Sequence, residues 1–123
     1  MADVDLIKLG YKPLHTNRVQ SIDALTHAGI DGVFVKDGQF IVVETKYGTA
    51  GLSTANDGRQ ISNNWIESSD RLFNAVGGDL EREILRDGYN RVLARVQPDG
   101  SIKYSLVDVN GFVIQGPGGT FIP

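Results

Sequence analysis

The strongest constraint on how this chain folds is a strand–turn–strand pattern between residues 30 and 47. Residues 30–36 alternate in character, and residues 39–47 contain the β-branched run Ile41-Val42-Val43, which favours a buried strand. Asp37-Gly38 separates the two segments, and Asp-Gly between two such runs is a strong signal for a two-residue turn. The sequence therefore predicts a β-hairpin.

The N-terminal half predicts short elements around this hairpin. Residues 1–9 form a short expected helix that Gly10 stops. Residues 11–15 are at best an edge strand, because Pro13 has no amide hydrogen to donate. The polar residues 16–29 predict a loop or one helical turn, and the small, polar residues 48–58 predict a flexible loop.

The C-terminal half predicts two helices followed by two strands. Apolar residues recur at helical spacing from about Arg59 to Val76, and Gly77-Gly78 ends that pattern. A second helix is expected from Asp79, as its N-cap, to Gly88. The remaining segments are expected strands over 90–97 and 102–109, an Asn110-Gly111 hairpin signal leading to 112–114, and a loose tail at 116–119.

This order of elements indicates an α/β (α+β-like) fold, with a central mixed β-sheet flanked by helices. At 123 residues, without an internal repeat, the chain is expected to form a single domain, 1–123. No apolar run approaches the roughly 20 residues that span a bilayer, and no signal peptide is evident, so no membrane partner is expected. The absence of cysteine excludes disulfides and thiolate zinc sites.

Three charged residues lie on the apolar strands of the predicted hairpin. Glu44 and Lys46 directly follow the buried run and point to one face, because strand side chains repeat every two residues. Asp31 lies on the partner strand, and a turn at 37–38 brings it level with Glu44. The hairpin therefore predicts two carboxylates and a lysine at one end of a buried strand.

Two converging carboxylates repel each other unless a cation lies between them. Mg²⁺ suits such a place, because it prefers oxygen ligands and is commonly held by one or two carboxylates together with substrate phosphates. The main-chain carbonyl of Thr45 is a further candidate ligand. Beside the metal, Lys46 would orient or deprotonate a water molecule or neutralise charge on the phosphate. These residues would together provide the groups that phosphodiester hydrolysis requires.

These motifs resemble a known family. Residues 29–34 (GIDGVF), 42–48 (VVETKYG) and 58–66 (GRQISNNWI) are similar to the PD-(D/E)xK, or restriction-endonuclease-like, nuclease superfamily. More narrowly, they resemble the C-terminal toxin domains of bacterial polymorphic toxins, found in contact-dependent inhibition, Rhs and type VI secretion systems. The matching motifs lie between residues 29 and 66. The resemblance implies a restriction-endonuclease-like core.

The same resemblance implies specific roles for these residues. Asp31 and Glu44 would be metal ligands, Lys46 the catalytic lysine and Gln60 an auxiliary active-site residue. The implied activity is a metal-dependent DNA endonuclease that uses Mg²⁺, or Mn²⁺ or Zn²⁺. The protein would be secreted or delivered by a producing bacterium, possess a cognate immunity protein, and act in the cytoplasm of the target cell. An RNase on the same fold and a non-catalytic binding module are the alternatives.

The sequence departs from the family pattern in two places. The proline of the signature is replaced by Ile30, and the acidic residue often found on the first core helix has only weak candidates in Asp3, Asp5 and Asp23. The net charge of −3 is also unfavourable for a protein that binds phosphates. These features favour the binding-module alternative.

Several other residues have two interpretations. Gln60 is either an active-site group or an ordinary solvated residue at a helix start, and Trp65 is expected in the core rather than as a base-stacking platform. His15 and His27 are expected at the surface, with a minor catalytic alternative for His27. Phosphate contacts or a solvated surface of mixed charge are the two alternatives for the arginines at 59, 71, 91 and 95.

Overall fold

The predicted hairpin is present in the computed structural model, which describes residues 2–15, 30–52, 54–55 and 58–123. Strand β2 (Gly32–Lys36) pairs antiparallel with β3 (Gln39–Tyr47). Asp37 and Gly38 connect them with φ angles of 54° and 77°. Two successive positive φ angles are the mark of the type I′ turn that Asp-Gly favours. The turn therefore sets the register that the sequence indicated.

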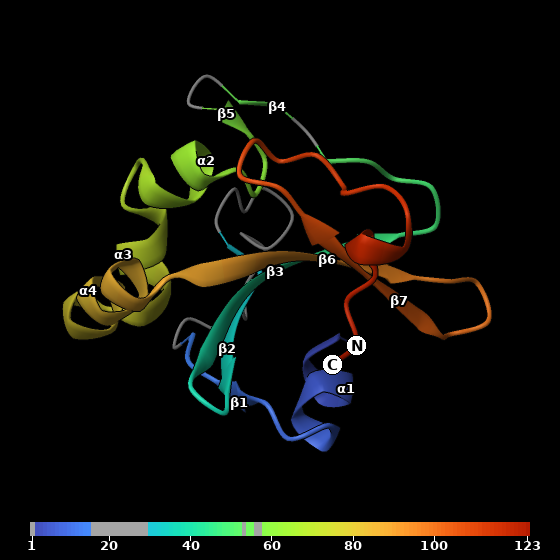
Figure 1. Ribbon diagram of the computed structural model, residues 1–123, viewed down its shortest axis with the longest axis horizontal. Coiled ribbons are helices and arrows are strands. Elements are labelled where there is room, and N and C mark those ends of the chain that lie inside the picture. Colours follow the sequence, from blue (N-terminus) through green and yellow to red (C-terminus); the bar gives the residue numbers. More distant parts are fainter. Residues whose placement is uncertain (1, 16–29, 53, 56–57) are drawn as a thin grey trace, which may run out of the picture.

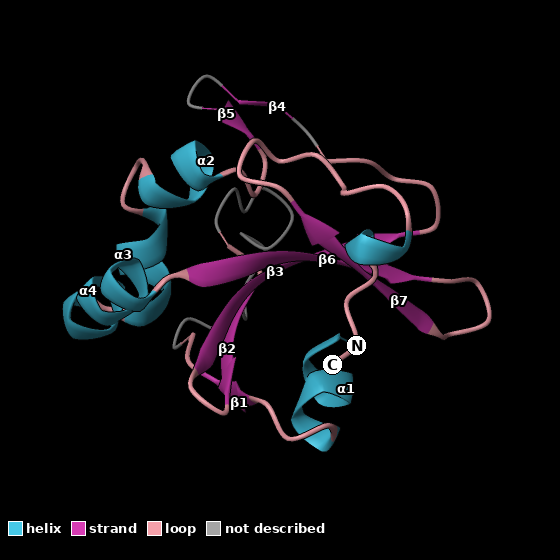
Figure 2. Ribbon diagram, viewed as in Figure 1, coloured by secondary structure: helices cyan, strands magenta, loops and turns pink. Residues whose placement is uncertain are grey.

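The hairpin is the middle of a five-stranded mixed sheet with the order β1-β2-β3-β6-β7 (Figures 1 and 2). The edge strand β1 (Lys12–Pro13) and the hairpin strands are antiparallel, as expected. Strand β6 (Tyr89–Val96) lies parallel to β3, and β7 (Ile102–Val107) lies antiparallel to β6. A parallel pair requires a long crossover connection, and here the intervening helices provide it. The mixed α+β architecture predicted from the sequence is confirmed at this level.

Helices cover the two faces of the sheet unequally. Helix α1 (Ala2–Lys8) packs on one face, where Leu6 is fully buried against residues such as Phe34 and Ile41. The other face carries α2 (Asn63–Glu67), α3 (Arg71–Val76) and α4 (Gly78–Asp87) (Figure 2). Buried residues of these three helices contact the central strands: Trp65, Ile66, Leu72, Ala75, Val76 and Ile84.

The single helix predicted over 59–76 is wrong, because the chain breaks it twice. Gly58–Arg59 is instead the short strand β5, and α2 begins only after Ser62, whose hydroxyl accepts a hydrogen bond from the Trp65 amide. Ser69 and Asp70 then have positive φ angles between α2 and α3. Serine and aspartate compete with helical hydrogen bonding through their own side chains. The apolar spacing that predicted one helix therefore continues across the break at Ser69 and Asp70.

The boundaries of α4 differ slightly from the prediction. Gly77, with φ 86°, is the N-cap, and the helix starts at Gly78. Asp79 therefore lies in the first turn rather than at the cap, where its charge still suits the positive end of the helix dipole. Gly88 ends the helix as predicted, donating its amide hydrogen to the Ile84 carbonyl.

Part of the segment 48–58, which was predicted to be a flexible loop, forms short strands. Strand β4 (Thr54–Ala55) pairs antiparallel with β5 (Gly58–Arg59) in a separate two-stranded sheet. Leu52 packs against the core on the helix-covered face. The loop prediction is therefore wrong at Thr54–Ala55 and Gly58, whereas residues 48–52 lie outside helices and strands.

The tail at 116–119, predicted to be loose, is packed against the sheet. Residues Pro117–Gly119 form a 3₁₀ turn, and Thr120 makes a bridge with Ser105 on β7. Gly119 is buried, and a Cβ placed on it would lie 1.8 Å from the Ile114 carbonyl oxygen. Glycine at 119 allows this close approach to Ile114 because it has no Cβ.

The hairpin signal at Asn110-Gly111 leads only to a single bridge, between Val107 and Val113.

The predicted loop or helical turn at 16–29 lies outside the described residues. Among the residues that the structure does describe, no helix is both long enough and apolar enough to cross a membrane.

Packing of the tail predicts different outcomes at two neighbouring glycines. Gly119→Ala is expected to lower the free energy of unfolding by about 1–3 kcal/mol, because its methyl group enters occupied space. Gly118→Ala is the matched control, since a Cβ there meets nothing within 4 Å, and its effect should be within about 0.5 kcal/mol. Urea unfolding measures both. Equal stability of the two variants would contradict the packed tail.

Candidate active site

Asp31 lies immediately before β2 and level with Glu44 on β3. Gly32 pairs with Val43, so the residue before Gly32 faces the residue after Val43. The Asp31 carboxylate accepts a hydrogen bond from the Thr45 amide through Oδ2, at 2.9 Å. This bond holds the carboxylate against β3 at the point where β2 no longer pairs with it. The level arrangement predicted from the turn is therefore observed.

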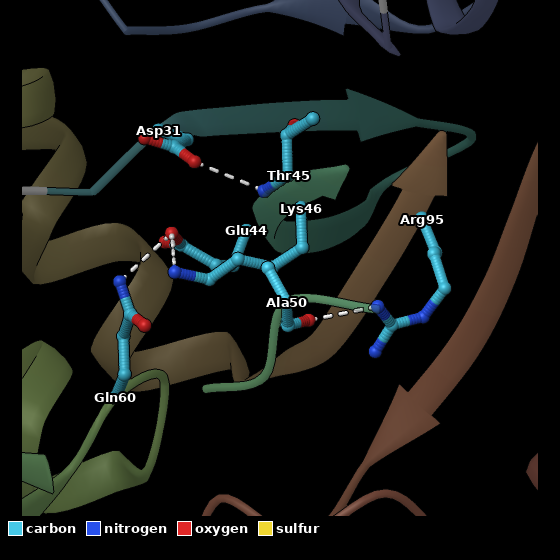
Figure 3. A network of polar contacts seen from close by, with 7 residues as sticks. All are labelled: Asp31, Glu44, Thr45, Lys46, Ala50, Gln60 and Arg95. Carbon is cyan, nitrogen blue, oxygen red and sulfur yellow. Dashed lines mark hydrogen bonds and ion pairs between the residues drawn. The ribbon is translucent and has the colours of Figure 1, made fainter. Parts of the chain in front are cut away.

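Glu44 is the buried group around which the other side chains gather. It is only 4% exposed, although it lies on a strand among apolar residues. Its Oε2 atom accepts a hydrogen bond from Gln60 Nε2 at 2.8 Å and lies 3.8 Å from Lys46 Nζ (Figure 3). Gln60, for which an ordinary solvated position was the alternative, thus directly contacts Glu44. The structure brings all the predicted site residues together at one end of β3.

The surroundings of Glu44 disfavour its charged form. Burial is the largest cause, and the charge of Asp31 and hydrogen bonding to it act in the same direction, raising the pKa of Glu44 to about 9. Lys46 opposes this shift but does not outweigh it. Burial and the neighbouring Asp31 carboxylate therefore favour the neutral form of Glu44. Two carboxylates close together share a proton for the same reason that they attract a metal ion.

The backbone that follows Gln60 is constrained. Ile61 has a φ angle of 64° and is fully buried. A β-branched residue in this left-handed region is unfavourable by about 1–3 kcal/mol, so the surrounding packing must hold it there. The next residues are fixed as well, by the Ser62 cap and by a bond from the Asn63 amide to the Val109 carbonyl. This strained turn directs the Gln60 side chain toward Glu44.

Arg95 on β6 holds the loop that follows β3. Its Nη1 donates to the carbonyl oxygens of Gly48 and Ala50, both at 2.7 Å. Figure 3 shows the bond to Ala50. Arg95 is the register partner of Lys46, so this clamp lies next to the predicted catalytic lysine. The sequence did not reveal this role, because the parallel pairing of β3 with β6 is not visible in a local pattern.

The other arginines also serve the fold. Arg59 donates to the Gly111 carbonyl, Arg71 to the Trp65 carbonyl, and Arg91 to the Val107 carbonyl and the Asn63 side chain. These residues therefore stabilise loops and helix ends, a role that neither of the two sequence interpretations included.

The structure places two other candidates, Trp65 and His15. Trp65 is 4% exposed and lies in the core, as predicted. His15, predicted at the surface, is half-buried: its Nδ1 accepts the Val33 amide at 3.1 Å, and its ring packs edge-on against Phe34. This contact extends the β1–β2 pairing. His27 lies outside the described residues.

A first-helix acid is not found at the site within the described part of the chain. Asp5 lies on α1, which covers the opposite face of the sheet, and its carboxylate accepts a hydrogen bond from Tyr104 at 2.6 Å. Asp23 and the side chain of Asp3 lie outside the described residues. Among the described residues, no group of three or more acidic, histidine or cysteine side chains forms a metal cage.

The donor set nevertheless suits one kind of ion. Asp31 and Glu44 offer two carboxylates at the end of the sheet, and Mg²⁺ is commonly bound through one or two carboxylates while keeping several waters. Exchange of the proton on Glu44 for a cation would remove the repulsion between the two groups. The metal-ligand roles of Asp31, Glu44 and the Thr45 carbonyl remain predictions.

Comparison with known proteins does not assign the chain to a family. No protein-family model matches the sequence, and no curated protein is significantly similar to it. The function is therefore inferred from the geometry of the site and from the resemblance of its motifs.

Burial of Glu44 predicts a pH-dependent stability difference. Because the folded pKa is raised, the stabilising effect of the protonated group is fully present below about pH 4.5 and is lost as the pH rises toward about 9. Without metal, the free energy of unfolding of Glu44→Gln should therefore exceed that of wild type by roughly 2–4 kcal/mol at pH 8. The two proteins should differ little near pH 4. Urea unfolding measures both.

Glu83→Gln is the control, because Glu83 is an exposed glutamate on α4. Mg²⁺ should stabilise wild type and leave the Glu44→Gln protein almost unchanged. Equal stability of wild type and Glu44→Gln across this pH range would contradict the strained, buried carboxyl.

Proposed function

We propose that this chain is a divalent-metal-dependent endonuclease of the PD-(D/E)xK superfamily that hydrolyses phosphodiester bonds of DNA. The observation that carries the proposal is the gathering of Asp31, Glu44, Lys46 and Gln60 at the end of β3, with Glu44 buried and in contact with two of them. A buried acid of this kind, in a setting that shifts its pKa, is typical of functional sites.

The alternative explanation for these residues is a surface ion pair on a half-exposed strand. Such a pair would be solvated and would contribute under about 1 kcal/mol. Glu44 instead lies in the central strand, paired on both sides, where an unneutralised charge is costly. A fold that keeps this residue there in spite of its cost supports a catalytic use.

Each side chain has a defined task in the proposed reaction. Asp31 and Glu44 would hold a divalent cation, which supplies positive charge to the phosphate and makes a water molecule more acidic. Lys46 places its ammonium group at the same end of β3, where it orients the attacking water and offsets charge that develops on the phosphate oxygens. Gln60 holds one oxygen of Glu44 by its hydrogen bond and so orients that ligand.

The architecture supports the assignment to this superfamily. A mixed five-stranded sheet has helices on both faces, and the acids lie on a hairpin in its centre. The auxiliary Gln60 comes from the segment that leads into the first helix after that hairpin. This arrangement agrees with the restriction-endonuclease-like core that the motifs imply.

The biological setting follows from the resemblance to toxin domains. As part of the proposal, the protein is delivered by a producing bacterium, cleaves DNA in the cytoplasm of a target cell, and is neutralised by a cognate immunity protein. Induction of the chain in a bacterial cytoplasm should then cause DNA loss and growth arrest. Growth unaffected by wild type would contradict the toxin role even if cleavage occurs in vitro.

A cleavage assay tests the enzymatic proposal. Purified protein with Mg²⁺ should cleave plasmid DNA, and EDTA should abolish the reaction. Asp31→Asn, Glu44→Gln and Lys46→Met should each lower the rate by about 10²–10³-fold or more, because each removes a charge aimed at the phosphate or the metal. Gln60→Ala should lower it by about 10–100-fold, since Gln60 orients a ligand.

The control is Asp79→Asn, which alters an aspartate on α4 far from this end of the sheet. It should retain full activity. Mn²⁺ and Zn²⁺ are tested in parallel, and cleavage that survives EDTA and all three substitutions would refute the metal-dependent site. Metal binding by wild type without any cleavage would favour the non-catalytic module.

The preferred substrate is decided by offering both nucleic acids. Plasmid DNA and total RNA, incubated separately with equal amounts of enzyme, should show faster loss of DNA. The Glu44→Gln protein serves as the blank for contaminating nucleases. Selective loss of RNA that the blank does not show would replace the DNase with an RNase on the same site.

A further inference from the structure

Three basic residues lie side by side across the sheet at the level of Lys46. Lys46 on β3 pairs with Arg95 on β6, and Arg95 pairs with Lys103 on β7. Directly paired residues on neighbouring strands point to the same face, so the three side chains form one row. With strands about 4.8 Å apart, the row is about 10 Å long.

This row, called here the basic row (Lys46, Arg95 and Lys103), lies on the same face as the candidate active site. Glu44 is two residues before Lys46, and Leu93, the register partner of Glu44, is two residues before Arg95. Toward its other end this face is apolar and covered by α2, α3 and α4. The face thus changes from buried core to acids and then to a line of cations.

Like charges placed directly opposite each other destabilise a sheet, so the basic row calls for compensating negative charge. Lys46 has Glu44 at 3.8 Å, and Arg95 has the Gly48 and Ala50 carbonyls. Lys103 is exposed, and no hydrogen bond or ion pair with it occurs among the described residues. Asp99, in the nearby turn, already accepts two bonds from Ser101. The compensation is incomplete at the Lys103 end.

The basic row stands out because the rest of the chain offers few cations for binding phosphates. The net charge is −3, and Arg59, Arg71 and Arg91 are engaged with carbonyl groups of the fold. Nucleic-acid affinity comes largely from cations that neutralise phosphates, so an acidic protein needs a local cluster of them. The basic row is such a cluster, and it begins at the residue proposed to act on the scissile phosphate.

We propose that the basic row is a track for the substrate backbone, along which Lys103 contacts a phosphate next to the one that is cleaved. This inference rests on the proposed nuclease function and adds how the substrate is held. Arg95 serves in the middle: its bonds to the loop use Nη1 alone, which keeps the guanidinium fixed while its other N–H groups remain donors. Substrate strands then cross the sheet from β3 toward β7.

Substitution of Lys103 tests the track without altering the catalytic residues. Lys103→Ala should raise KM several-fold with kcat unchanged, and it should reduce the slope of log kcat/KM against log salt concentration by about one. Lys103→Glu should cause a larger loss, and Lys103→Arg should restore binding. The alanine variant keeps the test informative if the glutamate variant folds poorly.

Lys12→Glu is the matched control. Lys12 is an exposed lysine on β1, at the opposite edge of the sheet, and its substitution changes the net charge as much as Lys103→Glu does. It should leave KM and the salt slope close to wild type. Affinity for a fluorescent DNA oligonucleotide, measured by anisotropy in EDTA, gives a second readout that needs no cleavage. Lys103 variants indistinguishable from Lys12→Glu in both readouts would overturn the track.

The two proposals fail in different ways. Cleavage by wild type that is insensitive to Lys103 would refute the track and leave the nuclease intact. Oligonucleotide binding that depends on Lys103, without any metal-dependent cleavage, would refute the nuclease and keep the row as a binding surface. A wild-type preference for DNA over RNA that is lost in Lys103→Ala supports the DNA track. The reverse preference would assign the track to RNA.

Discussion

A carboxyl group buried in the central strand of the sheet is the constraint on which the rest of this structure depends. Glu44 is almost fully buried, paired by its strand on both sides, and surrounded by apolar neighbours. Burial of a charge without a partner is strongly unfavourable. Gln60 and Lys46 lie against this carboxyl group, and its raised pKa favours the uncharged form.

The partners come from separate parts of the chain, each held by backbone interactions. Asp31 is fixed by the Thr45 amide, Gln60 precedes the strained residue Ile61, and Arg95 clamps the loop after β3. The site therefore lies on a strand end and on turns with limited freedom, rather than on a mobile surface. Such preorganisation is what electrostatic catalysis requires, because charges must be in place before the reaction begins.

Sequence patterns predicted the local part of this arrangement and missed the non-local part. The Asp37-Gly38 turn set the hairpin register, so the juxtaposition of Asp31 with Glu44 could be predicted by counting residues. The break between α2 and α3 was missed because apolar spacing continues through Ser69 and Asp70. The clamp by Arg95 was missed because it depends on parallel pairing with β3. The packed tail was missed because Gly119 looks like a flexible residue until its contact with Ile114 is known.

The parallel pairing of β3 with β6 also bears on how the protein folds. The two carboxylates share a hairpin with a two-residue turn, and the Asp31–Thr45 bond spans only 14 positions. The Arg95 clamp spans 47 positions and requires closure of the entire helical crossover. Longer loops carry a larger closure entropy, and non-local pairing slows folding. Asp31, Glu44 and Lys46 are thus brought together by a local step, whereas the Arg95 clamp on the loop after β3 forms only when β6 docks beside β3. The loop beside the site is therefore fixed only by completion of the fold, which couples the geometry of the site to the cooperativity of folding.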